Sequence, residues 1–85
     1  MYLHLGEKTV IRTENIIGIF DLDNTTVSKN TRDFLALSEK NKRVINVSND
    51  LPRSFIVCEE NGETSVYISQ LSSQTLYRRN KIKLI

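Results

Sequence analysis

Residues 53–69, RSFIVCEENGETSVYIS, contain two apolar, β-branched runs separated by a turn signal. This composition predicts strands at residues 54–58 and 64–69. Asn61-Gly62 lies between them, and an Asn-Gly pair favours the tight turn of a β-hairpin because both residues tolerate positive φ. The hairpin is the clearest structural signal in the chain, and it predicts an antiparallel sheet.

Further strands are predicted on the N-terminal side of this hairpin. Gly6-Glu7-Lys8 reads as a turn between two short extended segments, and Gly18 within a buried run suggests a β-bulge. Ser48 to Pro52 is a strong turn signal that ends another strand. These strands are expected at residues 2–5, 9–11, 15–22 and 43–47.

Two helices complete the expected fold. The first, at residues 31–41, would be capped by Ser28 or Asn30, with Phe34, Leu35 and Leu37 on its apolar face. The second, at residues 72–79, would be capped at Ser72-Ser73 and end in a basic turn. The fold class is therefore α+β, a small mainly antiparallel β-sheet with one middle helix and a short C-terminal helix.

Length and composition indicate one domain over residues 1–85. Apolar residues make up 39% and charged residues 26%, an ordinary soluble composition. A chain this short buries only about 60–65% of the surface that its unfolded form exposes. One cysteine cannot form an intrachain disulfide, and one histidine with one cysteine cannot build a zinc site. Self-association is the remaining common way to stabilise a small domain.

The sequence predicts a cytoplasmic protein without a membrane partner. No apolar run approaches the roughly 20 residues of a membrane helix. The first residues lack the basic start and apolar region of a signal peptide. A single cysteine, Cys58, also fits the reducing cytoplasm, and its apolar strand makes it a small core residue.

Positive charge is concentrated in the second half of the chain. Residues 1–42 carry six basic and six acidic residues, whereas residues 43–85 carry six and four, which gives the net charge of +2. The last ten residues contain four cations and no acid: Arg78, Arg79, Lys81 and Lys83. Such clustering is the electrostatic pattern expected of a protein that binds a polyanion.

One motif suggests an enzyme instead. Asp21, Asp23 and Thr25 follow an apolar strand as D-x-D-x-T, which resembles the nucleophile motif of magnesium-dependent haloacid-dehalogenase-type phosphatases. That chemistry also needs a lysine, a later acidic pair and a parallel sheet of well over a hundred residues. A hairpin after Ser48 leaves no room for these parts, so a polar turn is the preferred interpretation. We therefore predict no catalytic residue, metal, cofactor or small-molecule substrate.

Several segments together resemble a known family. They are His4-Leu5-Gly6, the pattern from Val10 to Phe20, Pro52-Arg53-Ser54, and the stretch from Tyr67 through Thr75-Leu76 to Arg79. In order and spacing they resemble the RemB branch of the RemA/RemB family, small bacterial regulators linked to extracellular-matrix (biofilm) genes. The resemblance implies ring-forming homo-oligomers, double-stranded DNA as partner, no cofactor and no catalysis.

The resemblance carries over residue by residue only in part. Arg53 falls on a basic position of the family's arginine-rich turn, and Arg79 on a basic position of the C-terminal helix. Asn15, Asp50 and Leu51 stand where the RemA branch has arginines.

The candidate DNA-binding residues fall on several segments. They are Arg53, Arg78, Arg79, Lys81, Lys83 and Arg43. They would contact the phosphate backbone from patches that the ring repeats. The alternative is a protein-interaction or scaffolding ring without DNA binding.

Overall fold

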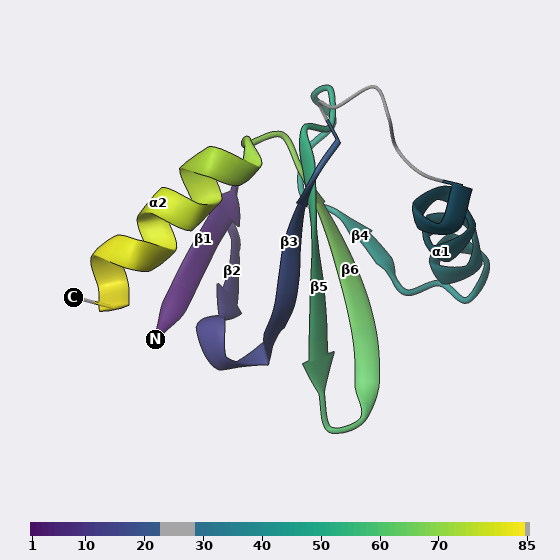
Figure 1. Cartoon of the computed structure of the whole chain (residues 1–85), viewed down its shortest axis with the longest axis horizontal. Helices are drawn as coiled ribbons and strands as arrows, with labels where there is room; N and C mark the ends of the chain where they lie inside the picture. Colours follow the sequence, from purple (N-terminus) through teal and green to yellow (C-terminus); the bar gives the residue numbers. More distant parts are fainter. Residues whose placement is uncertain (23–28, 85) are drawn as a thin grey trace.

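The computed structural model describes residues 1–22 and 29–84, with only the helical backbone of residues 80–84. This part of the chain forms strands and helices, with α1 between β3 and β4 and α2 at the C-terminal end (Figure 1). In order they are β1 (Tyr2–Gly6), β2 (Thr9–Arg12), the 3-10 helix η1 (Thr13–Asn15), β3 (Ile16–Asp21), α1 (Lys29–Lys40), β4 (Val44–Asn46), β5 (Ser54–Glu60), β6 (Glu63–Ser69) and α2 (Ser73–Leu84).

The predicted α+β class is confirmed, with mostly antiparallel strands in two sheets. Strands β1 and β2 form one sheet, and the other has the order β3-β5-β6-β4. The β5–β6 hairpin turns at Asn61 and Gly62, whose φ angles are 54° and 81°. Both angles are positive, as the Asn-Gly signal requires.

One pair of strands departs from the antiparallel expectation. Strand β4 pairs with β6 in parallel. Because β3 and β6 both run antiparallel to β5, β4 also runs in the direction of β3. Two strands of the same direction need a crossover connection, and α1 lies within the segment that joins β3 to β4. The middle helix is therefore the crossover of a β-α-β unit that carries the chain to the far edge of the sheet.

Strand β5 separates two apolar layers. Its first five residues, Ser54 to Cys58, are all buried. On one face Ile56 and Cys58 pack with Leu3 and Leu76, so this layer is closed by the β1–β2 hairpin and α2. On the other face Phe55, Val57 and Val66 form a smaller cluster with the partly buried Leu35 of α1. Figure 1 shows α2 and α1 on opposite sides of β3, β5 and β6.

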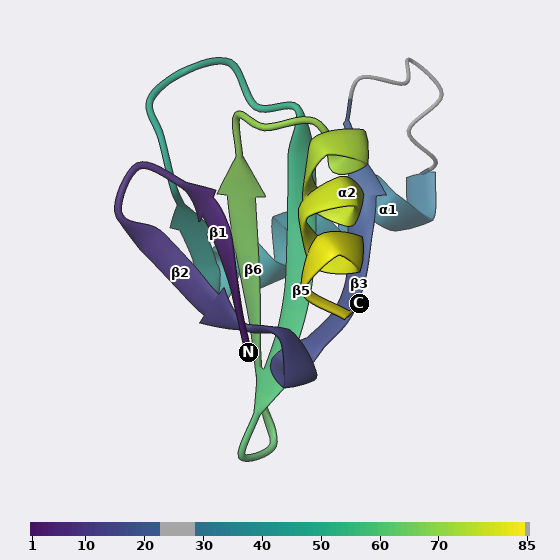
Figure 2. The same ribbon diagram turned by 90° about the vertical axis from the view of Figure 1, so that its left-hand side faces the viewer.

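Side-chain hydroxyl groups attach the β1–β2 hairpin and α2 to the larger sheet. The Oγ of Ser69 donates to the carbonyl of Leu5 at 2.6 Å and accepts the backbone N–H of Leu71 at 3.0 Å. On β3, the carbonyl of Ile19 accepts a hydrogen bond from the hydroxyl of Tyr77 at 3.0 Å. Figure 2 shows the hairpin and α2 lying in front of the larger sheet.

The bounds of several elements differ from the predicted ones. Helix α2 continues to Leu84 instead of ending at residue 79, because no glycine or proline follows to stop it. Its predicted cap is confirmed, since the N–H of Thr75 donates to the Oγ of Ser72 at 3.1 Å. Helix α1 begins at Lys29, so Asn30 lies in its first turn, and Ser28 lies outside the described residues.

Strand β3 is shorter than expected but contains the predicted bulge. Residues 13–15 form η1, so the strand begins at Ile16. The register shifts between Ile16 and Gly18, which confirms the irregularity at this glycine. A Cβ on Gly18 would lie 2.7 Å from Cζ of Phe20, so the phenyl ring occupies the space that a side chain would need.

In the described ranges, no helix combines the length and apolar character needed to cross a membrane.

We predict that Ser69→Ala lowers the free energy of unfolding by about 1–3 kcal/mol. The substitution leaves the buried carbonyl of Leu5 and the N–H of Leu71 without this partner. Urea denaturation followed by circular dichroism measures the change. Ser65→Ala is the matched control, because Ser65 is half-buried and its hydroxyl makes no hydrogen bond with the described residues. Equal losses in both variants would contradict the role of Ser69.

Candidate nucleic-acid interface

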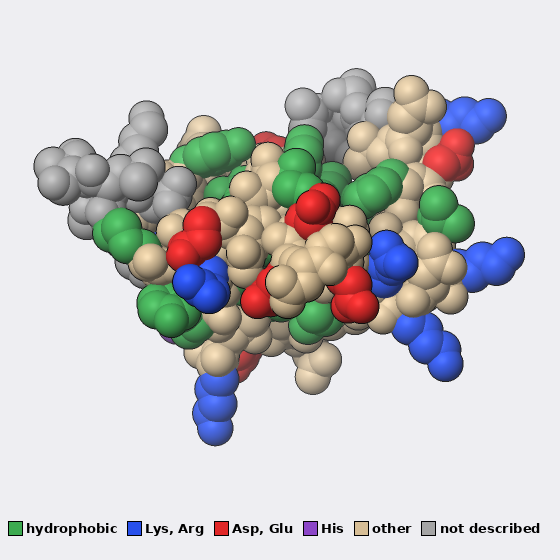
Figure 3. All heavy atoms as spheres, turned by 90° about the horizontal axis from the view of Figure 1, so that it is seen from below, with side chains coloured by type: hydrophobic (Ala, Val, Ile, Leu, Met, Phe, Trp, Pro, Cys, Tyr) green, Lys and Arg blue, Asp and Glu red, His purple; other side chains and the backbone are tan. Residues whose placement is uncertain are grey.

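Carboxylates gather at one end of the molecule. The tip of the β5–β6 hairpin carries Glu59, Glu60 and Glu63, all exposed. Figure 3 views this end, with acidic side chains toward its middle and basic side chains projecting nearer its margins. On η1, Glu14 pairs with Arg12 at 3.0 Å. This acidic tip would repel a polyphosphate, so a nucleic acid can approach more readily from the opposite end of β5.

Arg53 lies at that opposite end. It is exposed and immediately precedes β5, and its backbone N–H donates to the carbonyl of Ser69 at 2.9 Å. The neighbouring Ser54 donates its hydroxyl to the carbonyl of Leu71 at 2.8 Å. These two bonds hold Arg53 beside the connection that leads into α2. Asp21 pairs in register with Ser54, which places an acidic residue close to this cation.

Helix α2 carries four of the predicted basic residues, Arg78, Arg79, Lys81 and Lys83, in its middle and last turns. Arg78 is exposed, five residues from the first residue of the helix, or about 8 Å along its axis. Arg79 is half-buried, and its guanidinium Nη1 donates to the carbonyl of His4 at 3.1 Å. Arg79 therefore connects α2 to β1. Lys81 and Lys83 lie in the helical backbone of α2, and their side chains lie outside the described part.

Arg43 is separate from the other candidates. Its carbonyl accepts the N–H of Val66 at 2.8 Å, three residues before the point on β6 that Arg53 contacts. Three residues correspond to about 10 Å along a strand, and the step from β5 across β6 to β4 adds about 10 Å. Arg43 also immediately precedes the edge strand β4, near the end of α1, whereas α2 covers the opposite face. Arg53 therefore lies near the start of α2, whereas Arg43 lies away from both.

The loop before Arg53 exposes an apolar side chain. Leu51 has 83% of its surface exposed, more than any other large apolar side chain among the described residues. Asp50 beside it is also exposed, and its backbone N–H donates to the Oγ of Ser48 at 3.0 Å. Asn15, in η1, is half-buried near the acidic end. These three positions therefore contribute no cation to the surface around Arg53.

A second apolar surface lies beside α1, and the sequence pattern did not predict it. Phe34 and Leu37 were expected on the inward face of the helix, but they are 37% and 58% exposed, whereas Ser38 is buried. On the adjacent β3, Ile17 and Phe20 are 61% and 45% exposed. Helix α1 is rotated so that Ser38 packs inward and Phe34 and Leu37 turn partly outward, and the 3.6-residue apolar pattern gave no signal of this rotation.

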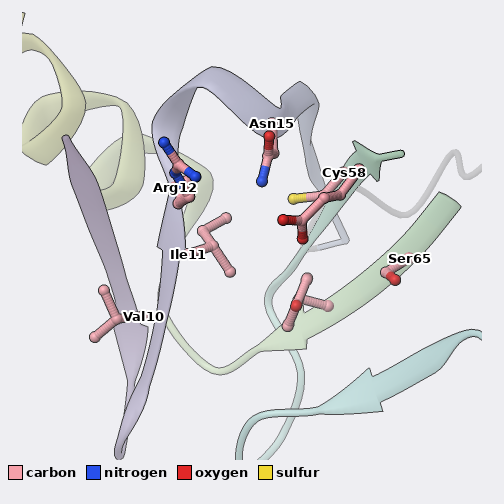
Figure 4. Close-up of a pocket in the computed structure, with 8 residues that line it drawn as sticks. Val10, Ile11, Arg12, Asn15, Cys58 and Ser65 are labelled. Carbon is pink, nitrogen blue, oxygen red and sulfur yellow. The ribbon is translucent and has the colours of Figure 1, made fainter. Parts of the chain in front are cut away.

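A small cleft of about 150 Å³ lies between β2, η1 and the β5–β6 hairpin. Figure 4 shows Asn15 and the sulfur of Cys58 pointing into it, while Val10 points away. Burial raises the pKa of the Cys58 thiol from 9.0 to about 11, and the nearby Glu60 carboxylate adds to the rise. A thiol with a raised pKa is a poor nucleophile, which agrees with its predicted role as a core residue.

The D-x-D-x-T motif gains little support. Asp21 ends β3, which pairs antiparallel with β5 and not in parallel as in the phosphatase sheet. Asp23 and Thr25 lie outside the described residues. In the described part of the chain, no group of three or more His, Cys, Asp or Glu side chains is placed to hold a metal ion.

Together these features define a small α+β protein whose candidate site is a charged surface. The chain matches the family model "RemA-like: Extracellular matrix regulatory protein A-like" over residues 2–79. It is 40% identical over 79 residues to "Extracellular matrix regulatory protein B" of Bacillus subtilis (strain 168), covering 93% of this chain and 89% of that protein. The chain therefore belongs to the RemA-like family of extracellular matrix regulators, which confirms the family resemblance of its sequence.

We predict that Cys58 reacts with iodoacetamide at pH 8 about a hundredfold more slowly in the folded protein than in urea. The rise in the pKa of the thiol from 9.0 to about 11 lowers the fraction of reactive thiolate at pH 8 about a hundredfold. Because folding keeps the thiol protonated, the free energy of unfolding falls as the pH rises from about 9 toward 11. Mass spectrometry of timed samples measures the rate, and equal rates in both states would contradict the burial of the thiol.

Proposed function

We propose that this protein is a non-enzymatic, DNA-binding transcriptional regulator of extracellular-matrix genes that acts in the cytoplasm as a homo-oligomeric ring. Arg53 and Arg78 contact the phosphate backbone of double-stranded DNA, and Lys81 and Lys83 add positive charge farther along α2. Arg79 contributes charge while it anchors α2 to β1. Membership of a family of extracellular matrix regulators supports the regulatory part of the proposal.

The observation that carries the DNA-binding part is the separation of charge along β5. Three exposed glutamates occupy the hairpin tip, whereas the exposed Arg53 and Arg78 lie toward the other end. Asp21 and Asp50 also lie near Arg53, so this end carries both signs of charge, but it lacks the three-carboxylate cluster of the tip. The tip therefore repels a polyphosphate more strongly, and this difference orients the encounter. Phosphate contacts hold the protein in position but carry little sequence information, so specificity comes from DNA shape and bendability.

A single protomer carries too little positive charge to bind DNA tightly. Its net charge is +2. A ring of n protomers carries +2n and presents the Arg53 surface n times. Each phosphate that is neutralised releases condensed counterions, and repeated weak contacts combine into one avid interaction. The exposed apolar side chains beside α1 supply a surface through which protomers can associate.

A second candidate function is a protein-interaction or scaffolding ring that does not bind DNA. The observation that favours it is the loop before Arg53, where Asp50 and Leu51 replace cations with a carboxylate and an exposed apolar side chain. Contact with a partner protein would remove this apolar side chain from water, which favours association, whereas the phosphate backbone of DNA offers it no comparable surface.

We predict that Arg53→Ala and Arg78→Ala each weaken DNA binding to a similar degree on all duplex sequences. Each phosphate contact that is lost reduces the slope of log K against log salt concentration by about 0.9. Fluorescence anisotropy with a labelled duplex at several salt concentrations measures both effects. Lys40→Ala is the matched control, since it removes one exposed cation from the end of α1. If Lys40→Ala weakens binding as much as Arg53→Ala, net charge and not this surface is responsible.

The two functions are separated by a mobility-shift titration of the unmodified protein. A shift at micromolar protein and moderate salt supports DNA binding, whereas an intact oligomer that gives no shift supports the scaffolding ring.

We predict a solution mass that is a multiple of 9.8 kDa and corresponds to a closed ring. Multi-angle light scattering after size-exclusion chromatography measures it without assuming a shape. A monomeric mass at high concentration would overturn the ring and, with it, the charge argument for DNA binding.

A further inference from the structure

An apolar groove lies between β3 and the first half of α1. Its volume is about 330 Å³, and among the described residues it is lined by Ile17, Phe20, Asn30, Thr31, Phe34, Phe55 and Val57. The rings of Phe20 and Phe55 stack with their centroids 4.9 Å apart and form part of its wall. We call this surface the α1 groove. None of these lining side chains is charged, so the groove suits an apolar occupant.

The same chain exposes one apolar side chain that could fill such a groove. Leu51, 83% exposed, lies on the segment of residues 47–53, which we call the Leu51 loop. Both ends of the loop are fixed, because the N–H groups of Val47 and Arg53 donate to the carbonyls of Ile68 and Ser69 at 2.9 Å. Pro52, next to Leu51, restricts the backbone further. The loop therefore presents Leu51 from an anchored backbone, which reduces the entropy lost on binding.

The Leu51 loop and the α1 groove lie on different parts of the protomer. Figure 2 shows the loop between β4 and β5 arching over one side, with α1 and β3 toward the other side. Contact between two such different surfaces joins copies head to tail. Repeated contacts of this kind close into a ring when the rotation between neighbours allows it.

Size and charge both favour Leu51 of another copy as the occupant. A cavity of about 150 Å³ already holds a benzene molecule, so the groove has room for a leucine side chain and its neighbours. Asp50 lies beside Leu51, and the exposed Lys29 and Arg32 flank the groove residues Asn30 and Thr31 on α1. Seating the loop against α1 would bring a carboxylate toward two cations, which is the charge complementarity of a specific interface.

We propose that Leu51 of one copy inserts into the α1 groove of the next copy, with Asp50 facing Lys29 and Arg32. This inference rests on the homo-oligomer in the proposed function and assigns the two surfaces that join its protomers. It also gives the Leu51 loop a role in assembly, next to the Arg53 that contacts DNA.

Cross-linking tests the contact directly. A chain that carries both Leu51→Cys and Ile17→Cys is treated with a short bismaleimide. Because each protomer then offers both halves of the contact, covalent ladders of several chains are expected on denaturing gels. An equimolar mixture of the two single variants should stop mainly at linked pairs. The unmodified chain should not react, since its Cys58 is buried. The control chain combines Ile17→Cys with Glu63→Cys, whose exposed site lies at the tip of the β5–β6 hairpin, at the opposite end of β5 from the Leu51 loop.

Mass measurements with surface variants provide the second test. Leu51→Asp and Ile17→Asp should each raise the concentration needed for assembly at least tenfold, as light scattering over a dilution series would show. Both side chains are exposed, so the circular dichroism spectrum should stay unchanged, and at concentrations where all chains are monomeric the unfolding midpoint should match that of the unmodified chain. Asp50→Arg should also weaken assembly, and combining it with Arg32→Asp should restore at least part of the loss.

The outcomes separate this inference from the proposed function. A monomeric unmodified chain would overturn the homo-oligomer, and the contact would fall with it. An oligomer that tolerates Leu51→Asp and Ile17→Asp, with no ladder beyond that of the control, would overturn the contact alone. The same result is expected if another protein occupies the groove, because purified copies would then assemble through other surfaces. Loss of assembly in both variants together with a ladder supports the contact.

Discussion

The fold depends on the burial of β5 on both of its faces. Residues 54–58 are all buried, so the sheet must be covered twice within a chain of 85 residues. The β1–β2 hairpin and α2 close one face around Leu3, Leu5 and Leu76, which are fully buried. Among the described elements, α1 alone covers the other face, and Phe20 remains 45% exposed there. The limited number of core residues thus completes one layer and leaves the other partly open.

The difference between the closed face and the partly open face of the sheet bears on both the stability and the proposed function of the protein. In the proposed ring, copies would associate through the face that a protomer leaves partly open, and association would multiply a charge of only +2. The elements that carry Arg53 and Arg78 belong to the closed side, where hydrogen bonds from Ser54, Ser69 and Tyr77 hold β5, the hairpin and α2 together. Occupation of the α1 groove would therefore leave these hydrogen bonds, and the arginines that they hold in position, undisturbed.

Local signals in the sequence were sufficient for most elements, whereas long-range contacts were not. The Asn61-Gly62 hairpin, the Ser72 cap and the Gly18 bulge depend on residues close in the chain, and all three were predicted. The parallel pairing of β4 depends on a crossover that no local pattern encodes. At the candidate site, the basic cluster of α2 was visible as charge. The bond from Arg79 to His4 spans 75 residues, and the apolar surface beside α1 depends on how that helix is rotated.

The hydrogen bond from Tyr77 to the carbonyl of Ile19 also affects how open the edge of the larger sheet is to other molecules. Strand β3 has β5 on one side only, so its outer backbone groups could recruit a strand from another molecule and start a fibril. The phenol occupies one of these acceptors and holds α2 close to the strand. This acceptor is thereby unavailable to a strand of another molecule, which disfavours extension of the sheet from this edge.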